Sequence, residues 1–262
     1  MELRYDGKVA VITGGVRGIG FATARILANG GAKLALVDIK EDLVQSSSKK
    51  LADETGAKVI GVRADVTSEE DVRKMAATVQ DKLGPADIFV SSAAIVDDKT
   101  FLQSSMADWK RMIDVCLYGP MLCIHALLPS MVERKYGRVI CLASDSARVG
   151  QARLSYYAAA KAGVVAITKS IAQEVGRSGV TMNIVSPGST NTEMRQERER
   201  QMREKMGEEK YQRHVQNVLR FYPVGRIGEP QDIASAIAFF ASEHASWITG
   251  QILSVNGGYT ML

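Results

Sequence analysis

Residues 8–20 of this 262-residue chain read Lys8-Val9-Ala10-Val11-Ile12-Thr13-Gly14-Gly15-Val16-Arg17-Gly18-Ile19-Gly20. The apolar, β-branched first half predicts a buried strand, and Ile19, Ala22 and Ile26 then recur at helical spacing. Glycines between a strand and a helix let the backbone turn tightly and approach a pyrophosphate at the helix N-terminus. The stretch therefore predicts a site for a phosphate-bearing cofactor.

Short apolar runs alternate with longer helical stretches along the rest of the chain. Counting the run at 8–13, the predicted strands are residues 8–13, 34–38, 59–62, 87–90, 139–142, 180–185 and 252–255. Thr67-Ser68-Glu69-Glu70 predicts a capping box at the start of another helix. Uniformly apolar strands separated by helices indicate a parallel sheet covered on both faces. We expect one α/β domain over residues 1–262, a three-layer, doubly wound parallel sheet of the Rossmann type.

Composition limits the classes of function. Hydrophobic residues make up 46% and charged residues 24%, which is typical of a globular protein. The net charge of +4 is mild and forms no basic stripe, so nucleic acid is not an expected partner. No apolar leader or membrane-spanning run is recognised, and we expect a cytoplasmic protein. Cys116, Cys123 and Cys141 lack metal-ligand spacing, which predicts buried reduced thiols and no metal site.

One segment, from about residue 193 to 225, interrupts the alternation of apolar strands and helices. It is rich in Arg, Glu, Lys, Gln and Met and poor in core residues. Two compatible interpretations are a solvated helical insertion and a mobile lid whose methionines adapt to a ligand.

An acidic residue, Asp38, ends the second predicted strand 18 positions after Gly20. A carboxylate there can accept hydrogen bonds from the adenosine ribose hydroxyls and would repel a 2′-phosphate. Arg17 acts in the opposite direction, because a cation beside the loop could bind that phosphate. We give more weight to the repulsion from Asp38, so the sequence favours NAD(H) over NADP(H).

Ser144, Tyr157 and Lys161 are the candidate catalytic residues. Tyr157 and Lys161 are four residues apart on a predicted helix and so share a face. The lysine ammonium and an oxidised nicotinamide ring would lower the pKa of the phenol, which would then exchange a proton with the substrate oxygen. Ser144 would hydrogen-bond that same oxygen. Tyr156 is the rival tyrosine, but it lies five residues from Lys161 and one helical step away.

These motifs resemble those of the short-chain dehydrogenase/reductase family over nearly the whole chain. The matching elements are Thr13-(x)3-Arg17-Gly18-Ile19-Gly20, Asp65-Val66, Tyr157-Ala158-Ala159-Ala160-Lys161, Asn183-Ile184-Val185-Ser186-Pro187-Gly188 and Val255-Asn256-Gly257-Gly258. The resemblance implies that Asp65 and Val66 hold the adenine. It implies a nicotinamide side formed by Pro187, Gly188, Thr190 and Thr192. With the loop and the catalytic residues, the expected cofactor-binding set also includes Gly14, Arg17, Gly18, Ile19, Gly20, Asp38, Ala93, Tyr157 and Lys161.

Two positions depart from the family pattern. Ser91-Ser92-Ala93-Ala94 stands where relatives usually have Asn-Asn-Ala-Gly, and Cys116 stands at the usual fourth catalytic residue, an asparagine. Cysteine keeps the main-chain carbonyl and loses the side-chain amide, so we expect an active enzyme with a perturbed proton relay. A cofactor-binding sensor or scaffold without catalysis is the second class, and turnover of secondary alcohols with NAD separates the two.

The substrate is less constrained by the sequence. Ser144, Arg148, Arg153 and Met194 are expected at the substrate, and the arginines suggest a carboxylate or phosphate unless they are ordinary surface residues. Ser144-Asp145 and residues 186–194 resemble 2,3-dihydro-2,3-dihydroxybenzoate dehydrogenases, and most motifs also resemble cyclic or aryl alcohol dehydrogenases. We therefore expect interconversion of a secondary, cyclic alcohol and its ketone, with a 3-oxoacyl-thioester reductase as the alternative. The resemblance also implies a homotetramer built on residues 109–133, 157–176 and the C-terminal strand.

Overall fold

The structure, a computed structural model, describes residues 2–261. Within them, seven strands form one parallel sheet in the order β3-β2-β1-β4-β5-β6-β7. The strands are β1 (Val9–Thr13), β2 (Lys33–Asp38), β3 (Val59–Arg63), β4 (Ile88–Ser91), β5 (Gly137–Leu142), β6 (Val180–Pro187) and β7 (Ile252–Val255). The predicted strands differ from these bounds by at most two residues at either end, and the predicted doubly wound α/β fold is confirmed.

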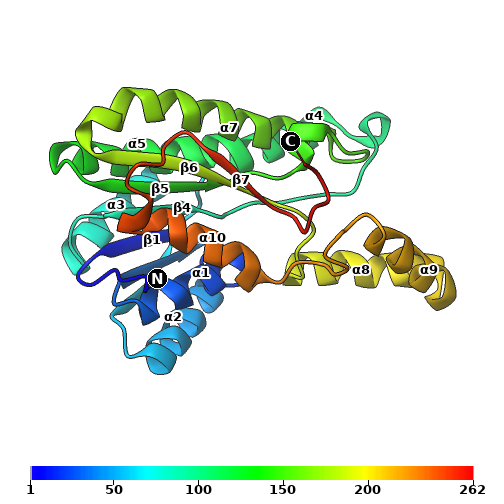
Figure 1. The fold of residues 1–262 in the computed structure, drawn as a ribbon, viewed down its shortest axis with the longest axis horizontal. Helices are drawn as coiled ribbons and strands as arrows, with labels where there is room; N and C mark the ends of the chain where they lie inside the picture. Colours follow the sequence, from blue (N-terminus) through cyan, green and yellow to red (C-terminus); the bar gives the residue numbers. More distant parts are fainter. Residues whose placement is uncertain (1, 262) are drawn as a thin grey trace.

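Helices connect the strands and cover both faces of the sheet (Figure 1). They are α1 (Gly18–Asn29), α2 (Glu41–Thr55), α3 (Glu69–Lys82), α4 (Met106–Ile113), α5 (Gly119–Glu133), α6 (Ser146–Val149), α7 (Ser155–Val175), α8 (Glu193–Met206), α9 (Glu208–Leu219) and α10 (Pro230–Ala241). Short 3₁₀ turns occur at η1 (Phe101–Gln103), η3 (Gly176–Ser178) and η4 (Glu243–Ala245), and a π-helical turn, η2 (Asp114–Tyr118), joins α4 to α5.

The strands are apolar on both sides because both sides are buried. In β1, Ala10 and Ile12 belong to the core shared with α1, α2 and α10. Val9 and Val11 point the other way, into the core shared with α3, α5 and α7. This alternation follows from the two-residue repeat of a strand, and it explains why the sequence shows continuous apolar runs.

The stretch from α4 through η2 to α5 corrects one expectation. Met106–Glu133 is a continuous helix of 28 residues, and its most apolar 18-residue stretch has a mean hydropathy of 1.7. By length and composition, this helix could cross a membrane. The expectation of no such run was therefore wrong. A core helix satisfies the same criteria, and α5 contributes Cys123, Ile124 and Met131 to the core beside the sheet.

The start of α3 corrects a second expectation. Ser68, and not Thr67, caps the helix, because its hydroxyl accepts the N–H of Asp71 at 3.2 Å. Thr67 is engaged elsewhere: its N–H and its hydroxyl both donate to Asp65 Oδ1, at 2.9 and 2.8 Å. The helix therefore begins one residue later than predicted, with a single N-cap hydrogen bond and not a capping box, because the Asp71 carboxylate accepts the Asp65 N–H at 3.0 Å.

The charged segment from residue 193 forms the helices α8 and α9, which extend from one side of the sheet body (Figure 1). Their side chains are largely exposed, and Tyr211 is the buried residue of the two helices. The predicted helical insertion is confirmed.

A buried carboxylate joins the C-terminal tail to the end of β5. Asp145 is 3% exposed and follows Ser144 in the chain. Its Oδ1 accepts from the Ser186 hydroxyl at 2.8 Å, and its Oδ2 accepts from Asn256 Nδ2 at 2.6 Å and from the Thr260 hydroxyl at 3.1 Å. Three neutral donors from two distant segments therefore converge on one ionisable side chain.

Replacing Asp145 with alanine is expected to destabilise the fold. The change removes the shared acceptor of three hydrogen bonds in a largely buried region, which costs about 3 kcal/mol. In a chain of this size, the midpoint of thermal unfolding should fall by about 6–12 °C. Asp81→Ala, at the exposed end of α3, is the control and should leave the midpoint nearly unchanged. Equal midpoints for the two variants would contradict the role given to Asp145.

Candidate active site

A cleft of about 830 Å³, here called the main cleft, lies over the carboxyl ends of the central strands. In a sheet of this order, the chain turns in opposite directions after β1 and β4, which opens a crevice at that edge. Residues expected at the cofactor or the substrate that line the main cleft are Gly14, Arg17, Gly18, Ile19, Asp38, Asp65, Val66, Ala93, Ser144, Tyr157, Lys161, Pro187, Gly188, Thr190, Thr192 and Met194.

The glycine loop forms one wall of this cleft. Gly14 has φ +64°, and a Cβ there would lie 2.8 Å from the Ala93 backbone nitrogen. Gly20 lies behind the wall and does not line the cleft, but a Cβ on it would lie 2.2 Å from the Gly14 carbonyl oxygen. α1 begins at Gly18 and has no acidic residue of its own in its first turn, although the Glu193 carboxylate of α8 lies close to Gly18. These features fit the diphosphate of a dinucleotide.

The end of β2 carries the charges that face the adenosine half of the cleft. Asp38 lies there, and its Oδ1 accepts the Lys40 N–H at 3.2 Å. Arg17 and Lys40 line the same cleft as Asp38, so two cationic side chains share this cleft with the carboxylate. Asp38 and Arg17 were expected at this place from the sequence, whereas Lys40 was not, because it is recognisable only as a basic residue two positions after the acidic one.

Tyr157 and Lys161 enter the cleft from α7, and Ser144 enters from the loop after β5. Lys161 is 2% exposed; its Nζ donates to the Leu142 carbonyl at 2.8 Å and lies 5.9 Å from the Tyr157 ring centroid. The Ser144 hydroxyl oxygen accepts from the Ser146 hydroxyl at 2.9 Å. The structure thus brings the three sequence-predicted residues to one place.

Burial has the largest effect on the pKa values of Tyr157 and Lys161 in the protein without a cofactor. It raises the pKa of the Tyr157 phenol, with a further rise from Cys116, while the hydrogen bond with Ser144 lowers it. Burial also lowers the pKa of Lys161, and Cys116 and Cys141 act the other way. The phenol is therefore protonated at neutral pH in the protein alone.

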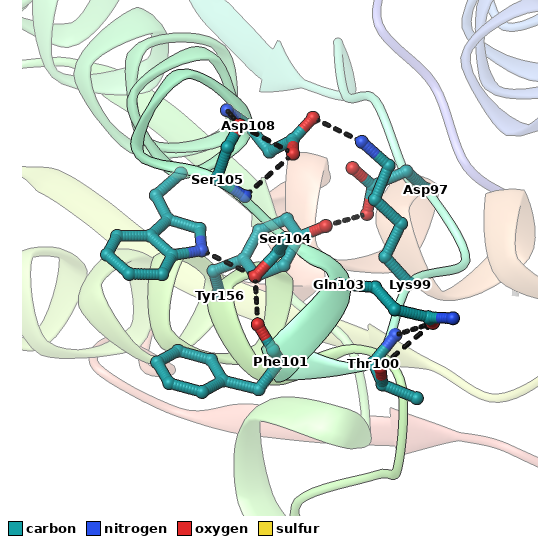
Figure 2. Close-up of polar contacts among 10 residues, drawn as sticks. Asp97, Lys99, Thr100, Phe101, Gln103, Ser104, Ser105, Asp108 and Tyr156 are labelled. Atoms are coloured by element: carbon teal, nitrogen blue, oxygen red, sulfur yellow. Dashed lines mark hydrogen bonds and ion pairs between the residues drawn. The ribbon is translucent and has the colours of Figure 1, made fainter.

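Tyr156 has a partner outside the main cleft. Its hydroxyl donates to Asp97 Oδ1 at 2.5 Å, in the segment that follows β4 (Figure 2). Figure 2 also shows Lys99 paired with Asp108 of α4 at 2.6 Å, and Asp108 accepting the Ser105 N–H at 2.9 Å. Tyr156 and these contacts fix the segment after β4 to α7 and α4. The two adjacent tyrosines therefore point to different surroundings, and Tyr157 is the one that lines the cleft.

Cys116 lies in the π-helical turn η2 and is fully buried. Its thiol donates to the Ile95 carbonyl at 3.5 Å, and Ile95 lines the main cleft. The side chain at this position therefore connects the long helix to the segment after β4. A π-helical turn often marks a functional position in a helix, because it shifts the register of the residues beyond it.

The expected substrate residues divide into two groups. Ser144 and Met194 line the main cleft, and Arg153 lines a neighbouring side hollow of about 480 Å³ that also reaches Ser144. Arg148 lines neither, because its guanidinium donates to the Ser254 hydroxyl on β7 at 2.6 Å. A place for Arg148 at the substrate therefore stays a prediction, and the structure gives this residue a partner more than a hundred residues away in sequence.

Two further residues of the site were not foreseen. Arg198 of α8 lines both the main cleft and the side hollow, and Asp98, after β4, lines the side hollow. The available signal for Arg198 was its spacing of three from Arg195, which places both on one face of a helix. Asp98 gave no signal, because its partners come from distant segments.

Comparison with known proteins agrees with this geometry. A family model described as enoyl-(acyl carrier protein) reductase matches residues 14–260. The 3-oxoacyl-[acyl-carrier-protein] reductase of Vibrio cholerae is 35% identical over 99% of this chain and 100% of that protein. The acetoacetyl-CoA reductase of a Synechocystis species is 36% identical over 99% of each. A crystal structure of levodione reductase superposes with a TM-score of 0.90 at 31% identity, covering 97% of this chain and 98% of the other.

This chain is therefore similar to these proteins along almost its entire length. It also has the glycine loop, the doubly wound sheet and the group formed by Ser144, Tyr157 and Lys161. The chain belongs to the short-chain dehydrogenase/reductase family of NAD(P)-dependent oxidoreductases.

Proposed function

We propose that the protein interconverts a secondary alcohol and its ketone, with Tyr157 as the general acid and base. The observation that carries the proposal is the position of Tyr157, beside Ser144 and the buried Lys161, in the cleft that the glycine loop also lines. Bound nicotinamide would supply or accept the hydride at the substrate carbon. The residues of the chain then have to bind the substrate oxygen and move its proton.

In the reducing direction, the Tyr157 hydroxyl donates its proton to the carbonyl oxygen as that oxygen gains negative charge. The Ser144 hydroxyl donates a second hydrogen bond to the same oxygen and holds it near the phenol. The ammonium of Lys161 stabilises the phenolate that remains. Because burial raises the pKa of Tyr157, the phenol holds its proton at neutral pH before a substrate binds and can act as the proton donor in reduction.

For the cofactor we propose NAD(H) over NADP(H). Asp38 supports this choice, since its carboxylate at the end of β2 would lie close to a 2′-phosphate. Arg17 and Lys40 offset part of that repulsion.

Two classes of ketone are the candidates. A cyclic ketone is supported by the fold similarity to levodione reductase, and a 3-oxoacyl thioester is supported by the names of two curated relatives reported above. We propose that α8 and α9 act as a lid over either substrate. Met194, Arg195 and Arg198 reach the cleft from α8, while most of the two helices is exposed.

We also propose a homotetramer that acts in the cytoplasm. The exposed side of η2, α5 and α7 presents Tyr118 and Met121, with exposed fractions of 52% and 40%, and the small residues Ala159 and Ala162. Small side chains let two helices approach closely, and exposed apolar residues favour burial against another subunit.

Removing the phenolic hydroxyl tests the catalytic assignment. Tyr157→Phe should lower kcat by about 100-fold or more, because acid–base catalysis contributes about 10²–10⁴-fold. The matched control is Tyr156→Phe, which loses the bond to Asp97 and should keep most of its turnover. Rates are followed by NADH absorbance on a panel of ketones. Tight NADH binding by the wild type with no turnover of any ketone would favour a sensor.

Neutralising Asp38 tests the cofactor assignment. Asp38→Asn should raise kcat/KM with NADPH by about tenfold, equivalent to about 1.4 kcal/mol, because one like-charge repulsion is removed. Asp42→Asn, on the exposed first turn of α2, is the control and should leave the preference unchanged. A wild-type enzyme that already prefers NADPH would refute the assignment.

Sedimentation velocity of the wild-type protein tests the assembly. The expected result is a single species with the mass of four chains. Replacing Met121 with glutamate should shift the distribution toward smaller species, because a charge would enter an apolar interface. A wild-type monomer would rule out the proposed tetramer.

A further inference from the structure

The side hollow lies between the loop before α7, the lid helices and the C-terminal tail. Its lining includes Ser144, His214, Tyr222 and Tyr259, so it opens directly beside the candidate catalytic serine. A substrate whose carbonyl oxygen meets Ser144 in the main cleft can extend into this hollow. The groups that line it therefore bear on what else the substrate carries.

Three arginines face the side hollow. Arg195 and Arg198 come from adjacent turns of α8 and line both the hollow and the main cleft. Arg153 comes from the loop before α7 and lines the side hollow but not the main cleft. Its φ of +70° is a left-handed conformation that a side chain of this size adopts only when its surroundings hold it there.

The charges of these arginines are unevenly matched. Arg195 pairs with Glu199 one turn along α8. Arg153 and Arg198 share a single carboxylate oxygen: Asp98 Oδ1 lies 2.5 Å from Arg153 Nε and 3.1 Å from a terminal nitrogen of Arg198. Two guanidinium groups thus divide one negative charge.

Neither Asp98 nor the nearby Asp145 supplies the second negative charge that would balance both arginines. Burial alone would raise the pKa of Asp98, but the hydrogen bond from Arg153 and the charge of Arg198 hold it below its usual range, so Asp98 carries only its one charge. Asp145 also lines the hollow, and its oxygens are taken by Ser186, Asn256 and Thr260. Arg198 Nε is buried and has no hydrogen-bond partner in the described part of the chain.

We propose that Arg198 and Arg153 form a binding site for an anionic group, a carboxylate or a phosphate, on the carbonyl substrate. A guanidinium binds such groups through two parallel N–H donors, and the unpartnered Nε of Arg198 supplies one of them. The inference rests on the proposed function, which puts the reacting oxygen at Ser144. Because Arg198 also lines the main cleft, the anionic group that it binds could instead be the cofactor diphosphate. Arg153 lines only the hollow, which favours an anionic group on the substrate.

The test compares two oxo acids, acetoacetate and levulinate, with their uncharged methyl esters. Arg198→Gln and Arg153→Gln should each raise KM for the acids by about 10- to 100-fold and leave KM for the esters nearly unchanged. Arg200→Gln is the matched control: it lies on the same helix with a largely exposed side chain paired to Glu197, and should change neither. NADH affinity, measured by fluorescence, should stay constant in all three variants.

Several outcomes would overturn the proposal. They are equal losses for acids and esters, an effect of Arg200→Gln as large as that of Arg198→Gln, or weaker NADH binding in place of a change in KM. Calorimetry of acetoacetate with the NAD⁺-bound protein separates this site from the reductase assignment. Binding by the wild type that is lost in Arg198→Gln supports the anion site even if no ketone is turned over. Equal binding by both proteins, or no binding by the wild type, refutes it.

Discussion

The close approach of three backbone segments at the carboxyl ends of β1 and β4 is the constraint on which the rest of the structure depends. Gly14 touches the backbone at Ala93, and Gly20 packs on the Gly14 carbonyl, so neither position has space for a side chain. This contact places α1 against the sheet with its N-terminus at the crevice. It also brings the segment after β4 to the site. There Cys116 bonds to Ile95, Tyr156 bonds to Asp97, and Arg153 pairs with Asp98.

Much of this arrangement could be predicted from local patterns. The strands are short, apolar and β-branched, and the spacing of Tyr157 and Lys161 fixes a shared helical face whatever surrounds it. Two side chains have partners that the sequence pattern does not reveal. Arg148 bonds to Ser254 on the last strand, far away in the sequence, and Thr67 is taken by the turn at Asp65, two residues before it. A long apolar helix likewise cannot be recognised as a core element until the sheet it covers is known.

The site combines a rigid half and an adaptable half. Lys161, Cys116 and Asp145 are almost fully buried, and each is bonded to main chain or to side chains from another segment. The wall formed by α8 instead carries exposed ion pairs along its outer side, Arg200–Glu197 and Arg203–Glu208, which contribute little to stability. Under the proposed function, the proton donor needs a fixed position and substrate entry needs a wall that moves, and different segments would meet these two requirements.

Asp98 has a consequence for the protein when no ligand is bound. Partly buried guanidinium groups without a counter-charge would destabilise the folded chain, because each would lose hydration and gain nothing in return. One carboxylate shared between Arg153 and Arg198 reduces that penalty. An incoming anion must then compete with an acid that the protein itself provides. The contact that stabilises the protein without a ligand therefore lowers its affinity for the anion. Such a site favours a ligand that is bound briefly and then released.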